Sequence, residues 1–223
     1  MITDGLVLYL PLYSVDLQGS PIISKDSNHF SCTVDGATWT RQGRTFNGDD
    51  IILITVNALF APANFSFGGW YKPSSIATAV GVLCCTDGGN FGISLNVNQN
   101  GDGLITGWAR SAAAWKTTGD STTVMEVGTW YHCMMTYDSV RLRLYVNGVE
   151  ENSSALTTAI TYNAAPTLSI GSTWFAGAGG NYLLGTAGEI WLHNRALTVA
   201  ESLQNYLETL KTYKACWDYF TWG

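Results

Sequence analysis

Residues 128–149 read Gly128-Thr-Trp-Tyr-His-Cys-Met-Met-Thr-Tyr-Asp-Ser-Val-Arg-Leu-Arg-Leu-Tyr-Val-Asn-Gly-Val149, and this stretch decides the fold. Its first half, Trp130 to Tyr137, predicts one strand, because its side chains alternate between two faces. The face expected to enter the core carries Tyr131, Cys133, Met135 and Tyr137. Asp138-Ser-Val140 predicts a turn, so the next strand is expected to run back beside the first.

The second half of the stretch predicts the returning strand and a tight hairpin. In Arg141 to Val146, alternation places Leu142, Leu144 and Val146 inward and Arg141, Arg143 and Tyr145 outward. Asn147-Gly148 is typical of a type I′ turn, because both of its central residues need positive φ. A further strand begins at Val149. The stretch therefore predicts an antiparallel meander with one core face.

Strand patterns continue on both sides of this meander. Short apolar or alternating runs are found at Leu6–Leu10, Ile51–Val56, Phe65–Tyr71, Leu168–Ile170 and Glu189–His193. Between the last two runs, residues 171–180 predict a Gly-rich loop. The pattern indicates an all-β chain without internal repeats or linkers.

One helix is expected near the end of the chain. Thr198-Val-Ala-Glu201 has the spacing of a capping box. The apolar residues that follow fall at helical spacing and are Leu203, Tyr206, Leu207, Leu210 and Tyr213. We expect this helix to lie outside the sheets and to bury Leu203, Leu207 and Leu210. The interpretation is one domain over residues 1–213 and an aromatic tail over residues 214–223.

The composition excludes several classes of partner. Charged side chains make up only 13% of the 223 residues, and the formal net charge is −6. An acidic chain without a basic stripe does not suit nucleic acid, whose binding depends on cations that replace counterions. No apolar run approaches the ~18 residues of a membrane span, so no membrane insertion is expected. Leu6–Leu12 lacks a basic flank and a cleavage site, so we interpret it as a strand rather than a signal peptide.

The cysteines do not form a disulfide or zinc pattern. There are five, an odd number, at Cys32, Cys84, Cys85, Cys133 and Cys216. No CxxC pair is present, and adjacent cysteines rarely bridge each other. We expect all five to be reduced, with buried thiols that act as small hydrophobic groups.

Several segments together point to a known family. They are Gly5–Leu12, Lys25–Asn28, Gly36–Trp39, Phe46–Asp50, Phe65–Pro73, Gly128–His132, Thr136–Asp138, Leu144–Val149, Leu168–Gly171 and Gly185–Leu197. In this order they resemble concanavalin A-like, laminin-G-like jelly-roll domains over residues 5 to about 208. The resemblance implies an all-β, antiparallel two-sheet jelly-roll sandwich with one short C-terminal helix. It does not choose a function, because this fold carries lectins, glycosidases, adhesion modules and virion proteins.

A second, narrower resemblance concerns the N-terminal part. Leu17–Pro21, Cys32–Trp39 and Arg44–Asp50 are similar to stand-alone jelly-roll proteins of tailed bacteriophages. This resemblance implies a location on a virion surface or outside the cell, without a signal peptide.

The sequence gives little indication of catalysis or of metal binding. Glycoside hydrolysis needs two carboxylates that face each other across the sugar. Relatives with that activity carry a Glu-x-Asp-x-(x)-Glu cluster, which is absent here; Glu150 and Glu151 are adjacent, and Glu189 stands alone in its strand. We therefore expect no catalytic residues and no enzyme activity. His132 is interpreted as a packed or hydrogen-bonded scaffold residue.

Calcium is considered because many relatives carry an Asp just before the acidic residue of the last core strand. That position is Gly188 here, which offers no side-chain oxygen. Asp49, Asp50 and Glu189 could still contribute, although Asn47-Gly-Asp-Asp50 also fits a β-turn. We expect no metal and no cofactor, with calcium as the alternative.

Aromatic residues outside clear strand patterns are the best indication of binding. The candidate ligand-binding residues are Trp108, Trp115, Trp174, Phe175, Asn181 and Tyr182. Aromatic rings stack on the C–H faces of sugars, and amides bind hydroxyls. The same rings could instead close the ends of the sandwich or pack against neighbouring subunits, and the sequence leaves both interpretations open.

The tail supplies candidate subunit contacts, namely Trp217, Tyr219, Phe220 and Trp222. So much aromatic surface must pack somewhere. We favour a neighbouring subunit or a capsid protein over self-packing, and so expect a homo-oligomer.

The prediction for function is a non-catalytic recognition or surface module. It is expected to be a bacteriophage virion protein, either a head decoration or a tail component, that binds glycan or a capsid protein. The alternatives are a stand-alone carbohydrate-binding lectin module and a glycoside hydrolase with an unrecognised site.

Overall fold

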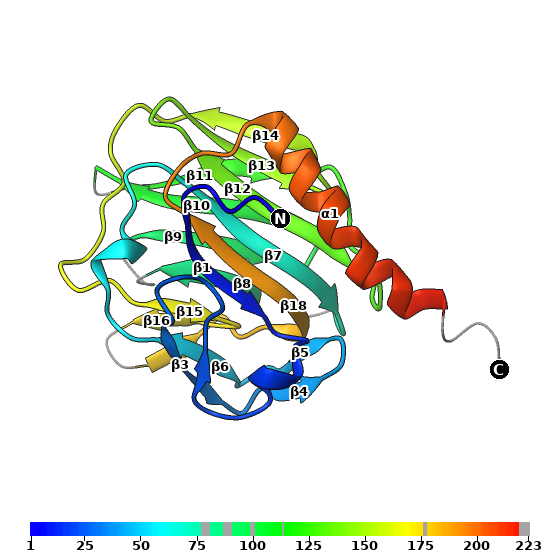
Figure 1. The fold of residues 1–223 in the computed structure, drawn as a ribbon. Coiled ribbons are helices and arrows are strands. Elements are labelled where there is room, and N and C mark those ends of the chain that lie inside the picture. The colour runs from blue at the N-terminus through cyan, green and yellow to red at the C-terminus, as the bar shows by residue number, and fades with distance from the viewer. Residues whose placement is uncertain (77–80, 87–90, 99–100, 113, 176–177, 219–223) are drawn as a thin grey trace.

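The part of the chain that the structure describes folds as a sandwich of two large antiparallel sheets with one α-helix on its outside (Figure 1). The computed structural model describes residues 1–223 except 77–80, 87–90, 99–100, 113, 176–177 and 219–223, and it leaves out the side chains of residues 175 and 214–218. Each large sheet has eight strands. The all-β jelly-roll prediction is confirmed.

The first sheet has the order β14-β13-β12-β7-β18-β5-β4, and β1 also pairs with β18. Its strands are β1 (Leu6–Pro11), β4 (Thr38–Thr40), β5 (Gly43–Asn47), β7 (Phe65–Pro73), β12 (Tyr131–Tyr137), β13 (Arg141–Val146), β14 (Val149–Ala155) and β18 (Leu184–His193).

The second sheet has the order β11-β10-β9-β8-β15-β6-β3-β2. Its strands are β2 (Ile22–Ile23), β3 (Ser31–Asp35), β6 (Ile51–Ile54), β8 (Gly81–Thr86), β9 (Ile93–Val97), β10 (Ile105–Ser111), β11 (Ala114–Asp120) and β15 (Leu168–Ile170). The remaining elements are the hairpin of β16 (Thr173–Phe175) and β17 (Ala178–Gly180), the 3-10 turns η1 (Val15–Leu17) and η2 (Ala58–Phe60), and helix α1 (Val199–Asp218).

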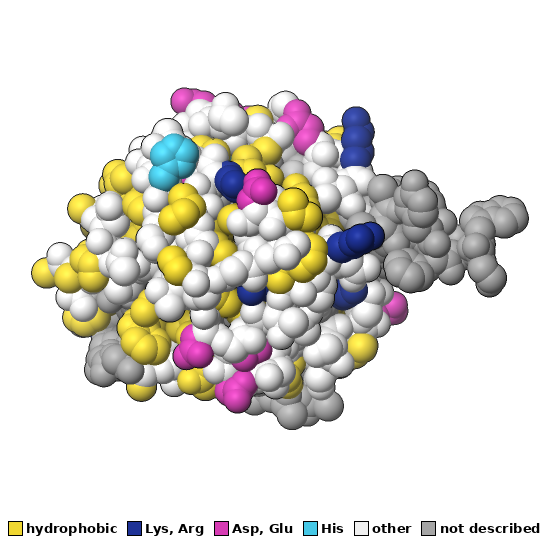
Figure 2. Space-filling view, turned by 60° about the horizontal axis from the view of Figure 1, so that its bottom comes forward, with side chains coloured by type: hydrophobic (Ala, Val, Ile, Leu, Met, Phe, Trp, Pro, Cys, Tyr) yellow, Lys and Arg dark blue, Asp and Glu magenta, His cyan; other side chains and the backbone are white. Residues whose placement is uncertain are grey.

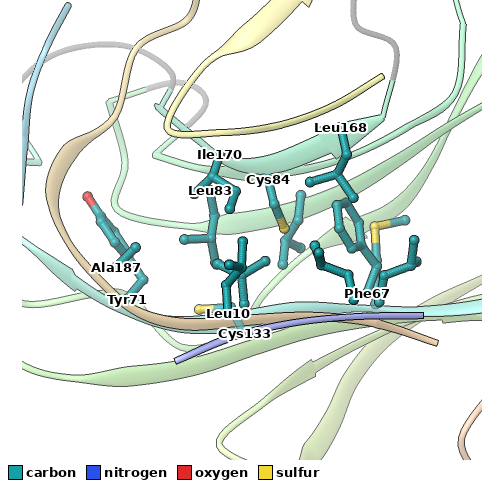
Figure 3. Close-up of a cluster of buried hydrophobic side chains, with 14 of the residues drawn as sticks. Leu10, Phe67, Tyr71, Leu83, Cys84, Cys133, Leu168, Ile170 and Ala187 are labelled. Carbon is teal, nitrogen blue, oxygen red and sulfur yellow. The ribbon is translucent and has the colours of Figure 1, made fainter. Parts of the chain in front are cut away.

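The main core fills the space between the sheets. In Figure 3, Phe67, Tyr71 and Cys133 of the first sheet meet Leu83 and Ile170 of the second. All of these side chains are buried in one apolar cluster. Each large apolar side chain that leaves water contributes about 1.5–3 kcal/mol, so this layer is the main source of stability.

The meander at residues 128–149 forms as predicted. β12 pairs with β13 from Cys133 opposite Val146 to Tyr137 opposite Leu142. Asn147 and Gly148 have φ values of 51° and 78°, as a type I′ turn requires. The inward faces of both strands are correct, since their predicted core residues all belong to the main cluster.

Helix α1 lies on the outer face of the first sheet, where it starts beside β14 (Figure 1) and packs Tyr213 against Gly188 of β18. The expectation that it lies outside the sandwich is therefore confirmed. Tyr145 faces outward as predicted, and it is buried there in the cluster beneath the helix. The helix also continues to Asp218, so residues 214–218 of the expected tail are helical.

The prediction of the buried helix face is wrong for two of its three leucines. Leu203 is 42% exposed and Leu207 is 50% exposed, whereas Leu210 is partly buried against the sheet. The buried face instead carries Ser202, Asn205, Thr209 and Tyr213. The predicted and observed buried faces of the helix differ because the outer face of the first sheet presents mainly polar and aromatic side chains to it.

Trp70 of β7 is the centre of this second cluster. Its indole Nε1 donates a hydrogen bond of 2.8 Å to Thr209 Oγ1. Its ring stacks on Tyr206 and Tyr213, with centroid distances of 5.7 and 4.5 Å. Seven residues of helix rise by about 10.5 Å, which leaves room for one ring between the two tyrosines. Small polar residues on the helix let it come close enough for this packing.

The face drawn in Figure 2 carries few charged side chains, and they lie among hydrophobic and neutral ones. In the part of the chain that the structure describes, no helix is both long enough and apolar enough to cross a bilayer.

Candidate functional site

The candidate site lies on the outer face of the second sheet, where β10 and β11 form its edge. Alternation along β10 places Ala109 in the main core and directs Trp108 and Arg110 to the opposite face. Trp108 and Trp115 were expected outside clear strands, and this expectation is wrong. They lie in β10 and β11.

The pairing of β10 with β11 brings two indole rings and a guanidinium group together. Arg110 is directly opposite Trp115, and Trp108 is opposite Thr117. The two indole centroids are 6.5 Å apart with an interplanar angle of 83°, and the Arg110 guanidinium carbon is 5.8 Å from the Trp115 ring centroid. Both rings are only partly buried. The rings therefore offer apolar faces beside a cation.

Hydrogen bonds hold the backbone of β10 at Arg110. Arg110 N–H donates to the Gly92 carbonyl at 2.8 Å, and the Arg110 carbonyl accepts from Thr161 N–H at 2.7 Å. On the other side of β10, Ser94 of β9 is opposite Trp108 and Asn96 is opposite Thr106. Both of these β9 side chains are buried, and the Ser94 hydroxyl donates to Asn96 Oδ1.

The other predicted ligand residues gather around the β16–β17 hairpin. Residues 171–180 were expected to form a loop, but they contain this hairpin, in which Trp174 is opposite Gly179. Asn181 is exposed with φ 51°, and its carbonyl accepts from Val82 N–H. A Cβ on Gly179 would lie 2.5 Å from the Tyr182 hydroxyl, so Tyr182 is packed against the hairpin. Phe175 belongs to β16, and its side chain lies outside the description.

The hairpin covers the same outer face, a short way across the sheet. Ser169 alternates with the core residues Leu168 and Ile170, so it points outward, and its hydroxyl donates to the Ser172 carbonyl at 2.8 Å. Cys85 Sγ is 3.0 Å from the same hydroxyl. Only β9 separates β8 from β10, a span of about 10 Å between the outer two strands. The predicted residues therefore form two groups on one face, Trp108 with Trp115 and Trp174 with its hairpin neighbours.

The carboxylates considered for catalysis lie elsewhere and are already occupied. Glu189 is 1% exposed under helix α1, where the Tyr9 hydroxyl donates to its Oε2 at 3.1 Å. Burial raises the pKa of Glu189 to about 7, partly opposed by that hydrogen bond. Glu150 is 3.7 Å from Arg143, and Glu151 accepts hydrogen bonds from the backbone N–H groups of residues 122 and 123.

His132 is a packed residue, as expected. It is fully buried on the outer face of the first sheet, and its ring contacts Trp70, Trp191 and Tyr206. Desolvation lowers the pKa of His132 to about 3, so the imidazole is neutral at physiological pH.

Gly188 is explained by packing. A Cβ at this position would lie 2.4 Å from atoms of the Tyr213 ring, so helix α1 requires glycine here. The Asp50 side chain accepts from Asn47 N–H at 2.9 Å, as the β-turn interpretation predicts. Among the described residues, no group of three or more His, Cys, Asp or Glu side chains could hold a metal ion.

Two further predictions involve residues near the C-terminus whose side chains the structure does not describe. Cys32, Cys84, Cys85 and Cys133 are buried and unbridged, whereas the side chain of Cys216 is not described. The expected subunit contacts Trp217, Tyr219, Phe220 and Trp222 also lie outside the described side chains.

Arg110 is the site residue that sequence reasoning missed. A signal was present, because Ile105-Thr-Gly-Trp-Ala-Arg-Ser111 alternates and places Trp108 and Arg110 on one face. The contact of Arg110 with Trp115 depends on the β10–β11 register, which the sequence leaves open.

The comparisons with known proteins agree with this architecture. Residues 46–201 match a family model described as the concanavalin A-like lectin/glucanases superfamily. No curated protein matches the chain in sequence.

Three solved structures illustrate the likeness. Domain 4 of AbnA, a GH43 extracellular arabinanase from Geobacillus stearothermophilus, in complex with arabinotriose, has a TM-score of 0.71 and 21% identity, over 89% of this chain and 97% of that one. The receptor-binding domain of botulinum neurotoxin D has a TM-score of 0.70 and 14% identity, over 93% of this chain and 53% of that one. Trypanosoma rangeli sialidase in complex with sialic acid has a TM-score of 0.68 and 20% identity, over 93% of this chain and 33% of that one. The likeness to these proteins shows the fold.

Proposed function

Because this chain belongs to the concanavalin A-like lectin/glucanases superfamily, we propose that it is a non-catalytic module that binds carbohydrate. The binding surface is the outer face of the second sheet around Trp108 and Trp115. The observation that carries the proposal is the pair of half-buried, nearly perpendicular indole rings on two hydrogen-bonded strands.

The geometry suits a sugar for a physical reason. A pyranose or furanose ring has apolar C–H faces and a rim of hydroxyl groups. The indole faces of Trp108 and Trp115 can cover the C–H groups, while the partly buried Thr117, which is opposite Trp108 on β11, can reach hydroxyls. Rings held on rigid strands lose little conformational entropy when a ligand binds.

The structural neighbours support the same class of ligand. One was solved with arabinotriose, and a structure of the botulinum neurotoxin D ligand-binding domain was solved with N-acetylneuraminic acid. The role proposed here is binding without hydrolysis, since the buried Glu189 already accepts a hydrogen bond from Tyr9. Hydrolysis of any member of a polysaccharide panel would contradict the non-catalytic part of the proposal and favour the glycosidase alternative.

Binding can be tested by a glycan array followed by calorimetry with the best ligand. Trp108→Ala and Trp115→Ala should each weaken binding about tenfold or more, as expected for aromatic anchors. The matched controls Trp108→Phe and Trp115→Phe keep an aromatic ring and should retain most of the affinity. Trp174→Ala tests separately whether the β16–β17 hairpin contributes to glycan binding. If both alanine variants bind as the wild type does, the surface is elsewhere.

We also propose a setting for this module, the surface of a bacteriophage particle, where it would act as a homo-oligomeric head decoration or tail component. The N-terminal resemblance supports this setting, and so do the four described cysteines, whose buried free thiols suit a chain that matures in a reducing compartment. Light scattering of the purified protein and mass spectrometry of purified particles test it. A monomer that is absent from particles would favour a stand-alone lectin.

A further inference from the structure

Arg110 differs from the other arginines that the structure describes with partners. Arg143 pairs with Asp138 at 2.6 Å, and Arg195 pairs with Glu201 at 2.7 Å and Asp4 at 2.7 Å. Arg44 is buried and donates to backbone carbonyls, and Arg141 donates to Ser153 Oγ. The interaction described for the Arg110 side chain is with the Trp115 ring, and no ion pair among the described residues includes it.

Among the residues that the structure describes, no ion pair therefore balances the charge of this guanidinium group. The acidic side chain of β11 on this face is Asp120, which lies opposite Thr106 and accepts a hydrogen bond from its hydroxyl. Four residues of strand separate Thr106 from Arg110, a distance of roughly 13 Å. Asp120 forms no ion pair with Arg110 among the described residues, and charges separated by more than the Debye length of about 8 Å are largely screened at physiological ionic strength.

The position of the cation also fits a ligand that is held by the two tryptophans. Arg110 is two residues along β10 from Trp108 and directly opposite Trp115. Its planar guanidinium group therefore lies beside the surface formed by the two indole rings. A sugar stacked on these rings would place its substituents against the fork. A guanidinium group binds a carboxylate through two parallel N–H···O bonds, a geometry that a neutral hydroxyl does not match.

From this juxtaposition we infer that the glycan bound at Trp108 and Trp115 is acidic, and that Arg110 binds the carboxylate of a uronic or sialic acid residue. The inference rests on the proposed function and adds the chemical class of its ligand. The inferred ligand is an anion, whereas the chain has a net charge of −6 that would by itself repel anions. Recognition must therefore depend on the local positive charge of Arg110.

The test compares ligands that differ only in charge. Calorimetry with trigalacturonic acid and its methyl ester, and with 3′-sialyllactose and lactose, should show at least one acidic ligand bound more tightly than its neutral partner. Arg110→Gln should weaken that binding about tenfold, the loss expected for a charge-assisted pair, and should leave the neutral ligand within about twofold. Arg110→Lys keeps the charge without the fork and should fall between the two. Arg41→Gln, an equal charge change in the turn between β4 and β5, is the control.

The outcomes separate this inference from the proposed function. Equal binding of acidic and neutral partners, or acidic binding unchanged in Arg110→Gln, overturns the carboxylate inference and leaves carbohydrate binding intact. Tighter binding of a sulfated sugar than of both carboxylated ligands also overturns it. If no ligand of either charge binds, both proposals fail.

Discussion

At the scale of single residues, Gly188 shows how one position can be read in two ways. The family resemblance implies an acidic calcium ligand at this position, so the sequence alone favours the interpretation of a lost ligand. In the structure the missing side chain makes room for the Tyr213 ring. The sequence reveals that a ligand oxygen is absent, but only the structure shows which group takes the space.

Glu189 leads to a prediction about pH. Burial raises its folded-state pKa to about 7 from an ordinary value of 4.5. The folded protein therefore holds this proton more tightly than the unfolded chain does. Its contribution to stability is fully present below about pH 4.5 and is lost as the pH rises to about 7. The loss should be roughly 3 kcal/mol, from about 1.4 kcal/mol for each pH unit.

The measurement is denaturant unfolding of the wild type and Glu189→Gln at several pH values. Gln keeps the shape of the side chain but does not titrate. The free energy of unfolding of the wild type should fall relative to the variant between about pH 4.5 and 7. His132, whose lowered pKa gives the opposite slope, is present in both proteins and cancels in the difference. A constant difference across this range would contradict the prediction.

At the scale of elements, helix α1 was predicted in type and start but not in orientation. The capping box forms, with Thr198 N–H donating to Glu201 Oε2 at 2.8 Å and Glu201 N–H donating to Thr198 Oγ1 at 3.2 Å. Hydrophobic spacing suggested that the leucines face the sheet. The choice of face depends on what the sheet presents, and here that is the Trp70 indole, which needs a hydrogen-bond acceptor as well as stacking partners.

This orientation predicts a contrast between two helix substitutions. Thr209→Val keeps the shape but removes the acceptor of the Trp70 N–H, which leaves a buried donor unsatisfied and should cost about 1–3 kcal/mol. Leu207→Ala removes a half-exposed side chain and should cost less than about 1 kcal/mol. Urea unfolding of both variants checks this. A larger loss for Leu207→Ala would indicate that the leucine face is the buried one.

The same scale explains why the site could be anticipated only in part. Trp108 and Trp115 were identified from their residue type, but their strands were missed because Gly and Ala weaken the β pattern around them. The contact between them follows from the β10–β11 register, which includes a bulge between Thr106 and Trp108. A shift of one residue in that register would place Trp115 on the other face.

At the scale of the whole molecule, the tail remains a prediction. Trp217, Tyr219, Phe220 and Trp222 are too apolar to be left in water, and we propose that they contact another subunit. Tyr206 and Tyr213, which stack on Trp70, lie before residue 214 and are kept when the tail is deleted. Deletion of residues 214–223 should therefore leave a folded protein that no longer self-associates.

Circular dichroism melting and light scattering of the truncated chain measure the two effects separately. The result expected is a melting temperature within a few degrees of the wild type and a smaller assembly. If the truncated chain melts many degrees lower while its assembly is unchanged, the tail belongs to the core of its own subunit.

The sequence by itself determined the all-β class, the meander at residues 128–149, its inward faces and the start of the helix. These features depend on alternation and turn residues among neighbours in the chain, so a short window of sequence is enough to predict them. Only the tertiary structure decided that the outer face of the first sheet is buried under α1, and that two tryptophans and an arginine share one surface. Those outcomes depend on pairs such as Trp70 with Thr209 and Gly188 with Tyr213. Such partners are far apart in the chain, and no local pattern encodes which of the available faces will meet.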